Sequence, residues 1–237
     1  MSLGLGLTLS SQGSECGGFS PDQIENLALW LRADSGVTKD GSDDVSQWDF
    51  KNGAFRGQSN VAQATGANQP DFNASNSAYA NKPTIDFNGS SDFLTSGNFS
   101  SDLTQPTTYF AVGNMGGSAQ NIFDGATATE RNALYRGAVN FGAYAGSVLN
   151  GPVGDSNSHI FELVLDGASS EIVTDGVSSG GDANTQDLRA LSVGANPTPG
   201  NYLTGSIAEI IVYTGEVSAA DRTLIREYLG GRYAITI

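Results

Sequence analysis

Apolar side chains in this sequence recur at alternate positions over short segments, which is the pattern of half-buried β-strands. Leu27, Leu29 and Leu31 alternate in this way, and residues 107–112 combine β-branched and aromatic side chains that favour strands. The patterns predict strands over residues 27–32, 45–50, 84–87, 93–94, 107–112, 121–123, 133–135, 139–144, 159–165, 171–174, 191–195 and 206–213. Many short strands between turn signals such as Asp166-Gly167 are typical of a β-sandwich or barrel.

Two segments carry helix start signals instead. Ser20-Pro21-Asp22-Gln23 combines a capping serine, a first-turn proline and a glutamine, which predicts a short helix. Ser218 to Asp221 is a capping box for a second helix, which we expect to end at Gly230-Gly231. Its predicted apolar face carries Leu224, Ile225, Tyr228 and Leu229. Residues 51–82 are rich in Asn, Gln, Ala and Ser and are predicted to form a long loop.

The chain is predicted to form one domain over residues 20–237, preceded by a flexible Gly/Ser-rich arm over residues 1–19. Its 237 residues lie within the range that single β-sandwiches occupy. The arm would place four leucines on one face of an extended strand, namely Leu3, Leu5, Leu7 and Leu9. We expect these leucines to contact a neighbouring subunit, and pairing within the same domain is the alternative.

Composition supports an all-β fold and argues against several partners. Charged residues make up 15% of the chain, against about 25% in ordinary domains, and residues that favour turns take their place. The net charge is −14 and no basic run exists, so we expect no nucleic-acid binding, which requires clustered Lys and Arg. The single Cys16 excludes an intramolecular disulfide. No apolar run approaches the ~18 residues that a membrane span requires, so we expect no membrane insertion.

The order of features resembles the laminin-G/pentraxin-like branch of the concanavalin A-like jelly rolls. The resembling segments are residues 29–34 (LWLRAD), 83–94 (PTIDFNGSSDFL), 161–167 (FELVLDG), 205–213 (GSIAEIIVY) and 217–233. The resemblance implies an all-β jelly-roll sandwich of two antiparallel sheets with one short C-terminal helix. It does not select a function, because this fold serves lectins, glycosidases, adhesion modules and virion proteins.

No catalytic set stands out, and we predict that the chain is not an enzyme. Glycosidases with this fold resemble one another in a strand that alternates Glu, Asp and Glu, and neither Glu162 nor Glu209 is followed by such a spacing. Glu209 is instead predicted on an exposed strand face. His159 begins an apolar strand, which favours a structural, hydrogen-bonded histidine, and Cys16 lies in the Gly-rich arm.

Calcium is the one metal that the sequence leaves open, and no other cofactor is expected. Asp86, Asn88 and Asp92 offer hard oxygen ligands at close spacing. The alternative is that Asn88-Gly89 makes a tight turn which Asp92 caps, and the absence of an EF-hand pattern favours this alternative.

Carbohydrate binding needs flat aromatic rings beside side chains that hydrogen-bond hydroxyl groups. The candidates in or beside polar, Asn-rich segments are Trp48, Tyr135, Tyr144 and Tyr202. Trp30 and Phe87 lie within apolar patterns and are predicted in the core.

Two functions follow. The first is a bacteriophage virion protein, such as a decoration, fibre or tail-associated subunit, which is made in the host cytoplasm, contacts other virion subunits or its own copies, and can bind a cell-surface glycan. It draws on the low charge and on the Leu/Gly arm, which has no basic residue before its apolar positions. The alternative is a bacterial extracellular carbohydrate-binding module.

Overall fold

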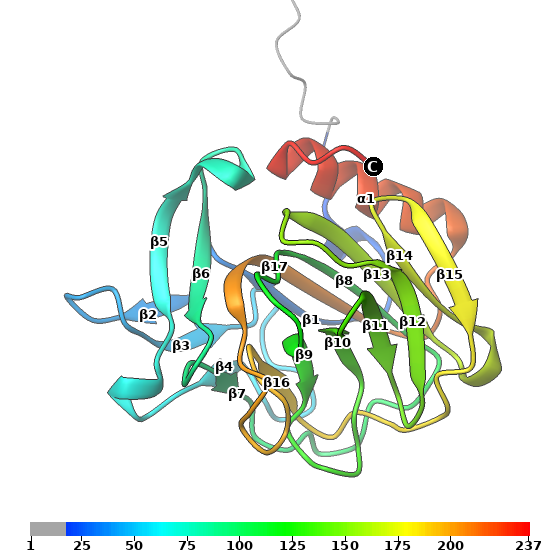
Figure 1. Ribbon diagram of the computed structural model, residues 1–237, viewed down its shortest axis with the longest axis horizontal. Helices are drawn as coiled ribbons and strands as arrows, with labels where there is room; N and C mark the ends of the chain where they lie inside the picture. Colours follow the sequence, from blue (N-terminus) through cyan, green and yellow to red (C-terminus); the bar gives the residue numbers. More distant parts are fainter. Residues whose placement is uncertain (1–17) are drawn as a thin grey trace, which may run out of the picture.

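The computed structural model describes residues 18–237 as two stacked antiparallel sheets (Figure 1). Over these residues, the strand order of the eight-stranded sheet is β15 (Val177–Gly181), β14 (Ser170–Thr174), β13 (His159–Leu165), β8 (Thr107–Gly113), β17 (Thr204–Thr214), β6 (Lys82–Asn88) and β5 (Asp71–Asn76). The eighth strand, β1 (Leu27–Arg32), pairs with β17. The predicted all-β sandwich is confirmed.

The nine-stranded sheet lies against the first one. Its order over the described residues is β12 (Val148–Val153), β11 (Asn140–Tyr144), β10 (Ala133–Arg136), β9 (Gln120–Gly125), β16 (Leu191–Val193), β7 (Leu94–Thr95), β4 (Asn60–Ala62), β3 (Val45–Asp49) and β2 (Val37–Lys39). The main core fills the space between the sheets and includes Trp48, Phe123, Phe141 and Phe161.

A second apolar layer lies on the other side of the eight-stranded sheet. There α1 (Ala219–Tyr233) packs Ile225, Leu229 and Tyr233 on side chains of the sheet such as Phe110. The central strands β8 and β13 are buried along their whole length, because one core covers each face. Strands buried on both faces are apolar runs without strict alternation, and this explains why their sequence signal is strong.

The helix starts where predicted and ends later. Ser218 caps α1 by accepting a hydrogen bond from the Asp221 N–H at 3.2 Å. The helix continues through the expected stop at Gly230 to Tyr233, because Gly230 serves close packing: a Cβ there would lie 3.0 Å from the Ile235 carbonyl oxygen. The predicted apolar face is wrong at Leu224, which is 44% exposed. None of the described helices is long and apolar enough to cross a lipid bilayer.

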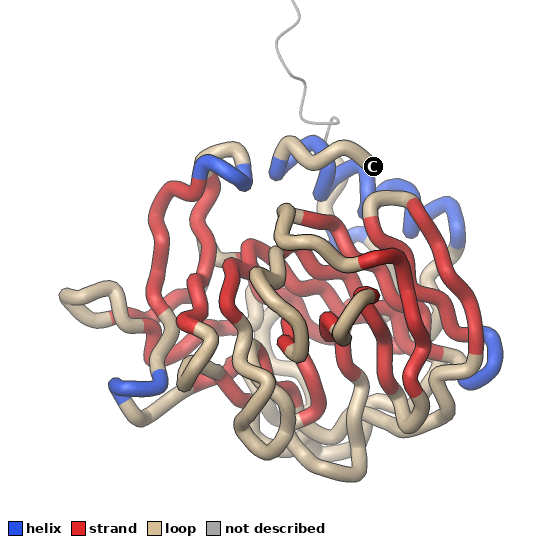
Figure 2. The backbone as a smooth tube through the Cα atoms, in the orientation of Figure 1, coloured by secondary structure: helices blue, strands red, loops and turns tan. Residues whose placement is uncertain are grey.

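The predicted long loop over residues 51–82 is wrong. This stretch contains β4, β5 and two 3₁₀ helices, η2 (Gly66–Asn68) and η3 (Ser77–Tyr79). Strand β5 is polar and largely exposed, and its antiparallel pairing with β6 holds it in place. Backbone hydrogen bonds do not depend on which side chains are apolar, so the hydrophobic pattern does not predict an edge strand of this kind. Two further 3₁₀ turns are η1 (Pro21–Gln23), as predicted, and η4 (Gly167–Ser169), and strands dominate the remaining chain (Figure 2).

Candidate functional site

The two outer faces of the sandwich differ in what covers them. Helix α1 covers the outer face of the eight-stranded sheet (Figure 1). The outer face of the nine-stranded sheet carries partly exposed polar and aromatic side chains at its β10–β12 end. Two of the predicted carbohydrate-binding tyrosines, Tyr135 and Tyr144, lie there on neighbouring strands. We call this area the β10–β11 face.

Tyr135 lies flat on the sheet because its cross-strand partner is a glycine. Tyr135 pairs with Gly142, while the adjacent pair of Leu134 and Ala143 points into the core. A Cβ atom at position 142 would lie 2.6 Å from Cζ and 2.8 Å from Oη of Tyr135, which is too close for any real side chain. The missing side chain therefore makes the space in which the Tyr135 ring rests against the strand.

A buried ion pair lies beside the two tyrosines. The Asp124 carboxylate is fully buried and accepts hydrogen bonds from Nε (3.0 Å) and Nη2 (2.6 Å) of Arg131 and from Asn121 Nδ2 (3.0 Å). The Arg131 guanidinium also stacks over the Tyr144 ring at 4.6 Å from its centroid. One network thus joins the Asn121 amide, the ion pair and the Tyr144 ring, and Asn121 is the backbone neighbour of Tyr135 in the β9–β10 register.

The charges of Asp124 and Arg131 neutralise each other. Burial raises the pKa of the Asp124 carboxyl, and the hydrogen bonds from Arg131 and from the Gly125 N–H counteract that rise. The hydrogen bond to Asp124 raises the pKa of Arg131, which stays charged. Asp124 and Arg131 thus hold each other in the charged state and in position. The face therefore offers oriented hydrogen-bonding groups with little net charge.

The other two aromatic candidates lie elsewhere. Tyr202 is partly exposed and packs on Phe93 with ring centroids 6.4 Å apart, and its neighbour Asn201 accepts a hydrogen bond from the Asn121 N–H. Tyr202 therefore lies beside the start of β9. Trp48 is fully buried in the main core, where no sugar can reach it, because β3 turns this residue toward the opposite sheet.

The three calcium candidates are engaged in hydrogen bonds. Asp86 accepts from Thr84 Oγ1 (2.7 Å) and Asn73 Nδ2 (3.0 Å). Asp92 accepts from the Asn88 N–H (2.9 Å) and from Asn88 Nδ2 (2.6 Å), the capped turn of the alternative interpretation. Among residues 18–237, no three His, Cys, Asp or Glu side chains are grouped to hold a metal ion. Calcium binding stays a prediction. The arm leucines Leu3, Leu5, Leu7 and Leu9, and Cys16, lie outside the described residues.

The predicted exposure of Glu209 is wrong, since only 1% of the residue is exposed. It lies on β17 beneath α1, where its carboxylate accepts hydrogen bonds from Trp30 Nε1 (2.5 Å), the Tyr233 hydroxyl (2.7 Å) and the Tyr228 hydroxyl (3.2 Å). Burial raises the pKa of Glu209, and the donors from Tyr233 and Trp30 counteract this. The helix that covers this glutamate follows it in the sequence, so the strand pattern alone gives no sign of burial.

His159 is hydrogen-bonded on both ring nitrogens. Its Nδ1 lies 2.5 Å from Asp175 Oδ2 and its Nε2 lies 2.7 Å from Asp155 Oδ1. Asp155 follows β12 of one sheet and Asp175 follows β14 of the other, so the histidine ties the two sheets together at their edge.

Sequence reasoning missed Asn121, Asp124, Arg131 and Gly142. The ion-pair partners are seven residues apart across a turn, and no pattern marks such a pair. Gly142 did carry a signal, because a glycine inside a strand often marks a place where another group approaches the backbone closely.

Comparison with known proteins places the chain by fold only. No family model matches the sequence, and no curated protein matches it. Domain 4 of AbnA, an extracellular arabinanase from Geobacillus stearothermophilus solved in complex with arabinotriose, superposes with a TM-score of 0.56 at 10% identity. The match covers 87% of this chain and 98% of that domain.

Two enzymes contain a similar domain as part of a longer chain. A GH54 α-L-arabinofuranosidase superposes with a TM-score of 0.53 at 12% identity over 80% of this chain and 51% of its own. Trypanosoma rangeli sialidase superposes with a TM-score of 0.52 at 11% identity over 87% of this chain and 32% of its own. This chain thus spans about a third of the sialidase, and the likeness is one of β-sandwich domains.

Proposed function

We propose that this chain is a carbohydrate-binding module that acts outside the cell, has no catalytic activity of its own, and binds a glycan on the β10–β11 face. The observation that carries the proposal is the Tyr135 ring lying over Gly142 on a face that α1 leaves free. A ring held flat against a sheet presents its other side to solvent as a rigid apolar platform. Rigid aromatic surface with a few placed polar groups is the usual composition of a small-molecule site.

The polar groups around the platform suit sugar hydroxyls. Asn140 is partly exposed and Asn150 is exposed on the neighbouring strands β11 and β12, and an amide can both donate and accept. Arg131 is fixed by Asp124, so its position does not have to be ordered when a ligand binds. Preorganised groups of this kind lose little entropy on binding.

The same geometry argues against hydrolysis at this face. A retaining glycosidase needs an acid and a nucleophile about 5 Å apart, each free to react. Both Asp124 oxygens accept from Arg131, and further donors come from Asn121 and the Gly125 N–H. A carboxylate saturated in this way neither donates a proton nor attacks a sugar.

The fold comparison supports this choice between the two functions that the sequence left open. The AbnA domain is almost completely covered by this chain and was solved with an oligosaccharide. The virion role drew on the low charge and on the N-terminal arm, whose leucines lie outside the described residues, and it stays a prediction.

Binding to soluble and insoluble polysaccharides, followed by affinity electrophoresis and calorimetry, tests the proposal. Tyr135→Ala should weaken glycan binding by about tenfold or more, because an aromatic contact contributes up to about 1.5 kcal/mol beyond its buried area. Tyr135→Phe keeps the ring and should retain most of the affinity. Equal binding by wild type and Tyr135→Ala, or no binding to any polysaccharide, would refute the proposal.

A further inference from the structure

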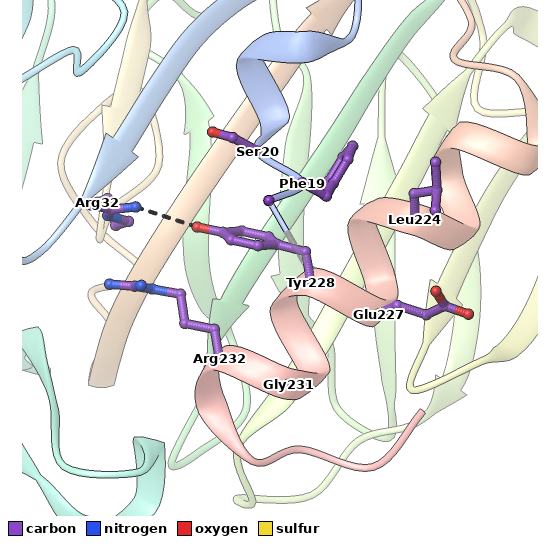
Figure 3. Close-up of a pocket in the computed structure, with 9 residues that line it drawn as sticks. Phe19, Ser20, Arg32, Leu224, Glu227, Tyr228, Gly231 and Arg232 are labelled. Atoms are coloured by element: carbon purple, nitrogen blue, oxygen red, sulfur yellow. Dashed lines mark hydrogen bonds between the residues drawn. The ribbon is translucent and has the colours of Figure 1, made fainter. Parts of the chain in front are cut away.

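A second site lies on the opposite side of the molecule, next to α1. Phe19 and Ser20 on one side and the C-terminal half of α1 on the other enclose a pocket of about 270 Å³. Figure 3 shows Arg32 and Arg232 with their guanidinium groups near the Tyr228 hydroxyl at one end of this pocket. We call it the Arg32/Arg232 pocket. Its volume is at the lower limit of ligand sites, which suits a molecule the size of one sugar residue.

One carboxylate holds the two arginines together. Arg32 Nε donates to Asp34 Oδ1 at 2.6 Å, and Arg232 Nη2 donates to the other oxygen of Asp34. Arg32 Nη1 makes one long hydrogen bond of 3.4 Å to Tyr228. Within the described part of the chain, Arg32 Nη2 and Arg232 Nη1 have no hydrogen-bond partner. The two arginines therefore have N–H groups to spare beside the pocket.

The charge balance around the pocket contrasts with the rest of the protein. The chain carries a net charge of −14, yet here two guanidinium groups face two carboxylates: both arginines contact Asp34, and Arg232 Nε lies 3.8 Å from Glu209 Oε2. Lys51 adds a third positive charge nearby, with its Nζ 4.0 Å from the Trp30 ring centroid, while Glu209 is enclosed beneath the tyrosines. Glu227 borders the pocket but points away from the arginines (Figure 3).

Limited exposure strengthens these charges. The side chains of Arg32 and Arg232 are 19% and 15% exposed, so little water competes for their spare N–H groups. The planar guanidinium group matches the geometry of a carboxylate better than an ammonium group does. Phe19 and Tyr228 meet edge to face with centroids 6.1 Å apart and give the pocket an apolar wall.

The arginines also help to attach α1 to β1, and this structural role alone would account for the Asp34 contacts. It does not account for a pocket at the unpaired N–H groups. We propose that the Arg32/Arg232 pocket binds a small organic carboxylate, such as an acidic monosaccharide, whose carboxylate group bridges the two arginines. This site is separate from the β10–β11 face and does not depend on glycan binding there.

The test uses glucuronate as the probe and glucose as its neutral analogue, with the full chain in calorimetric or NMR titrations. Glucuronate should bind saturably and more weakly as the salt concentration rises, and glucose should not bind at this pocket. Arg232→Lys keeps the charge but loses the forked geometry, and it should weaken glucuronate binding by about tenfold, as expected for one charge-assisted hydrogen bond.

A second pair of variants avoids the buried network. Leu224 borders the pocket and is 44% exposed, so Leu224→Glu adds a negative charge without unfolding the helix interface. It should weaken glucuronate binding several-fold, whereas the matched neutral Leu224→Gln should not. The proposal is overturned if glucuronate does not bind, if glucose displaces it from the pocket, or if both Leu224 variants bind it like wild type. Loss of glucuronate binding in Tyr135→Ala would also overturn it, because the ligand would then occupy the other face.

Discussion

Each outer face of the sandwich has a buried carboxylate paired with arginine, but the two ion pairs have different roles. On the covered face, the buried Glu162 carboxylate is bound by Arg222 at 2.7 Å and by Arg226, both from α1. On the β10–β11 face, the buried Asp124 carboxylate is bound by Arg131 at 2.6 Å. In the first case the arginines come from a distant element and join two layers. In the second case the arginine comes from the adjacent turn and stacks on Tyr144 of the same sheet.

What lies above each ion pair completes the comparison. Above Glu162 the arginines belong to a helix that is itself anchored by Ile225 and Leu229, so the ion pair is part of an interior. Above Asp124 the Arg131 guanidinium stacks on Tyr144, which is partly exposed. The two ion pairs therefore differ in what their arginines belong to and contact: Arg222 and Arg226 are part of the covering helix, whereas Arg131 stacks on a partly exposed ring.

The largest effect is expected from breaking the covered pair. Glu162→Ala leaves Arg222 and Arg226 facing an apolar sheet without their main partner, and removing one member of a buried ion pair costs about 3–5 kcal/mol. Urea unfolding of the variant should show a free energy of unfolding lower by about 3 kcal/mol. Glu171, which also contacts Arg222 but is 31% exposed, provides the control. Glu171→Gln should cost no more than about 1 kcal/mol, and equal losses in both variants would contradict the comparison.

A smaller effect is expected from the uncovered pair. Asp124→Asn keeps one acceptor and leaves only one arginine without its carboxylate, so the free energy of unfolding should fall by only about 1–2 kcal/mol. Glycan binding should weaken clearly in the same variant, because Arg131 and Asn121 lose their common anchor. A stability loss as large as that of Glu162→Ala, with unchanged binding, would mean that both ion pairs serve the interior.

The sequence predicted the elements that bury apolar surface, but not those that depend on partners far along the chain. Strands β8 and β13 and the start of α1 follow from side-chain pattern and capping. Strand β5 does not, since its polar residues are held by pairing with β6. Glu209 shows the same limit for a single residue, because its burial depends on Tyr228 and Tyr233 of a later helix.

Only part of the candidate site could be predicted, because the rest depends on partners far along the chain. Tyr135 and Tyr144 stand out as aromatic residues in polar segments, and the hairpin of β10 and β11 places both on one face. Trp48 shows the same local pattern but faces the core, since the direction of a strand's side chains is set by which sheet it joins. Local sequence thus identifies candidate rings, and only the register decides which of them are accessible.

A histidine at the edge between the two sheets should make stability depend on pH. Burial lowers the pKa of His159, but its hydrogen bonds with Asp175 and Asp155 outweigh burial and raise the pKa above the ordinary value of 6.5. The charged form thus stabilises the folded state fully below pH 6.5, and this contribution is lost as the pH rises through the raised pKa. Urea unfolding measured across this range should show a decrease in stability.

His159 is the only histidine in the chain, so a His159→Phe variant serves as a direct control. Its free energy of unfolding should be lower than that of wild type at low pH and should not decrease above pH 6.5. An unchanged pH slope in this variant would assign the pH dependence of stability to other groups.

The smallest effect on stability, and the most specific effect on binding, is expected from Gly142→Ala. The added Cβ would displace the outer end of the Tyr135 ring, which can swing away from the sheet, so the free energy of unfolding should change by less than about 1 kcal/mol. Gly180→Ala in β15 is the matched control, because its Cβ would meet nothing closer than 3.6 Å. Calorimetry should show weaker glycan binding for Gly142→Ala alone. If both alanine variants bind like wild type, the flat orientation of Tyr135 does not create the binding surface. The two faces would then differ only in that α1 covers one of them.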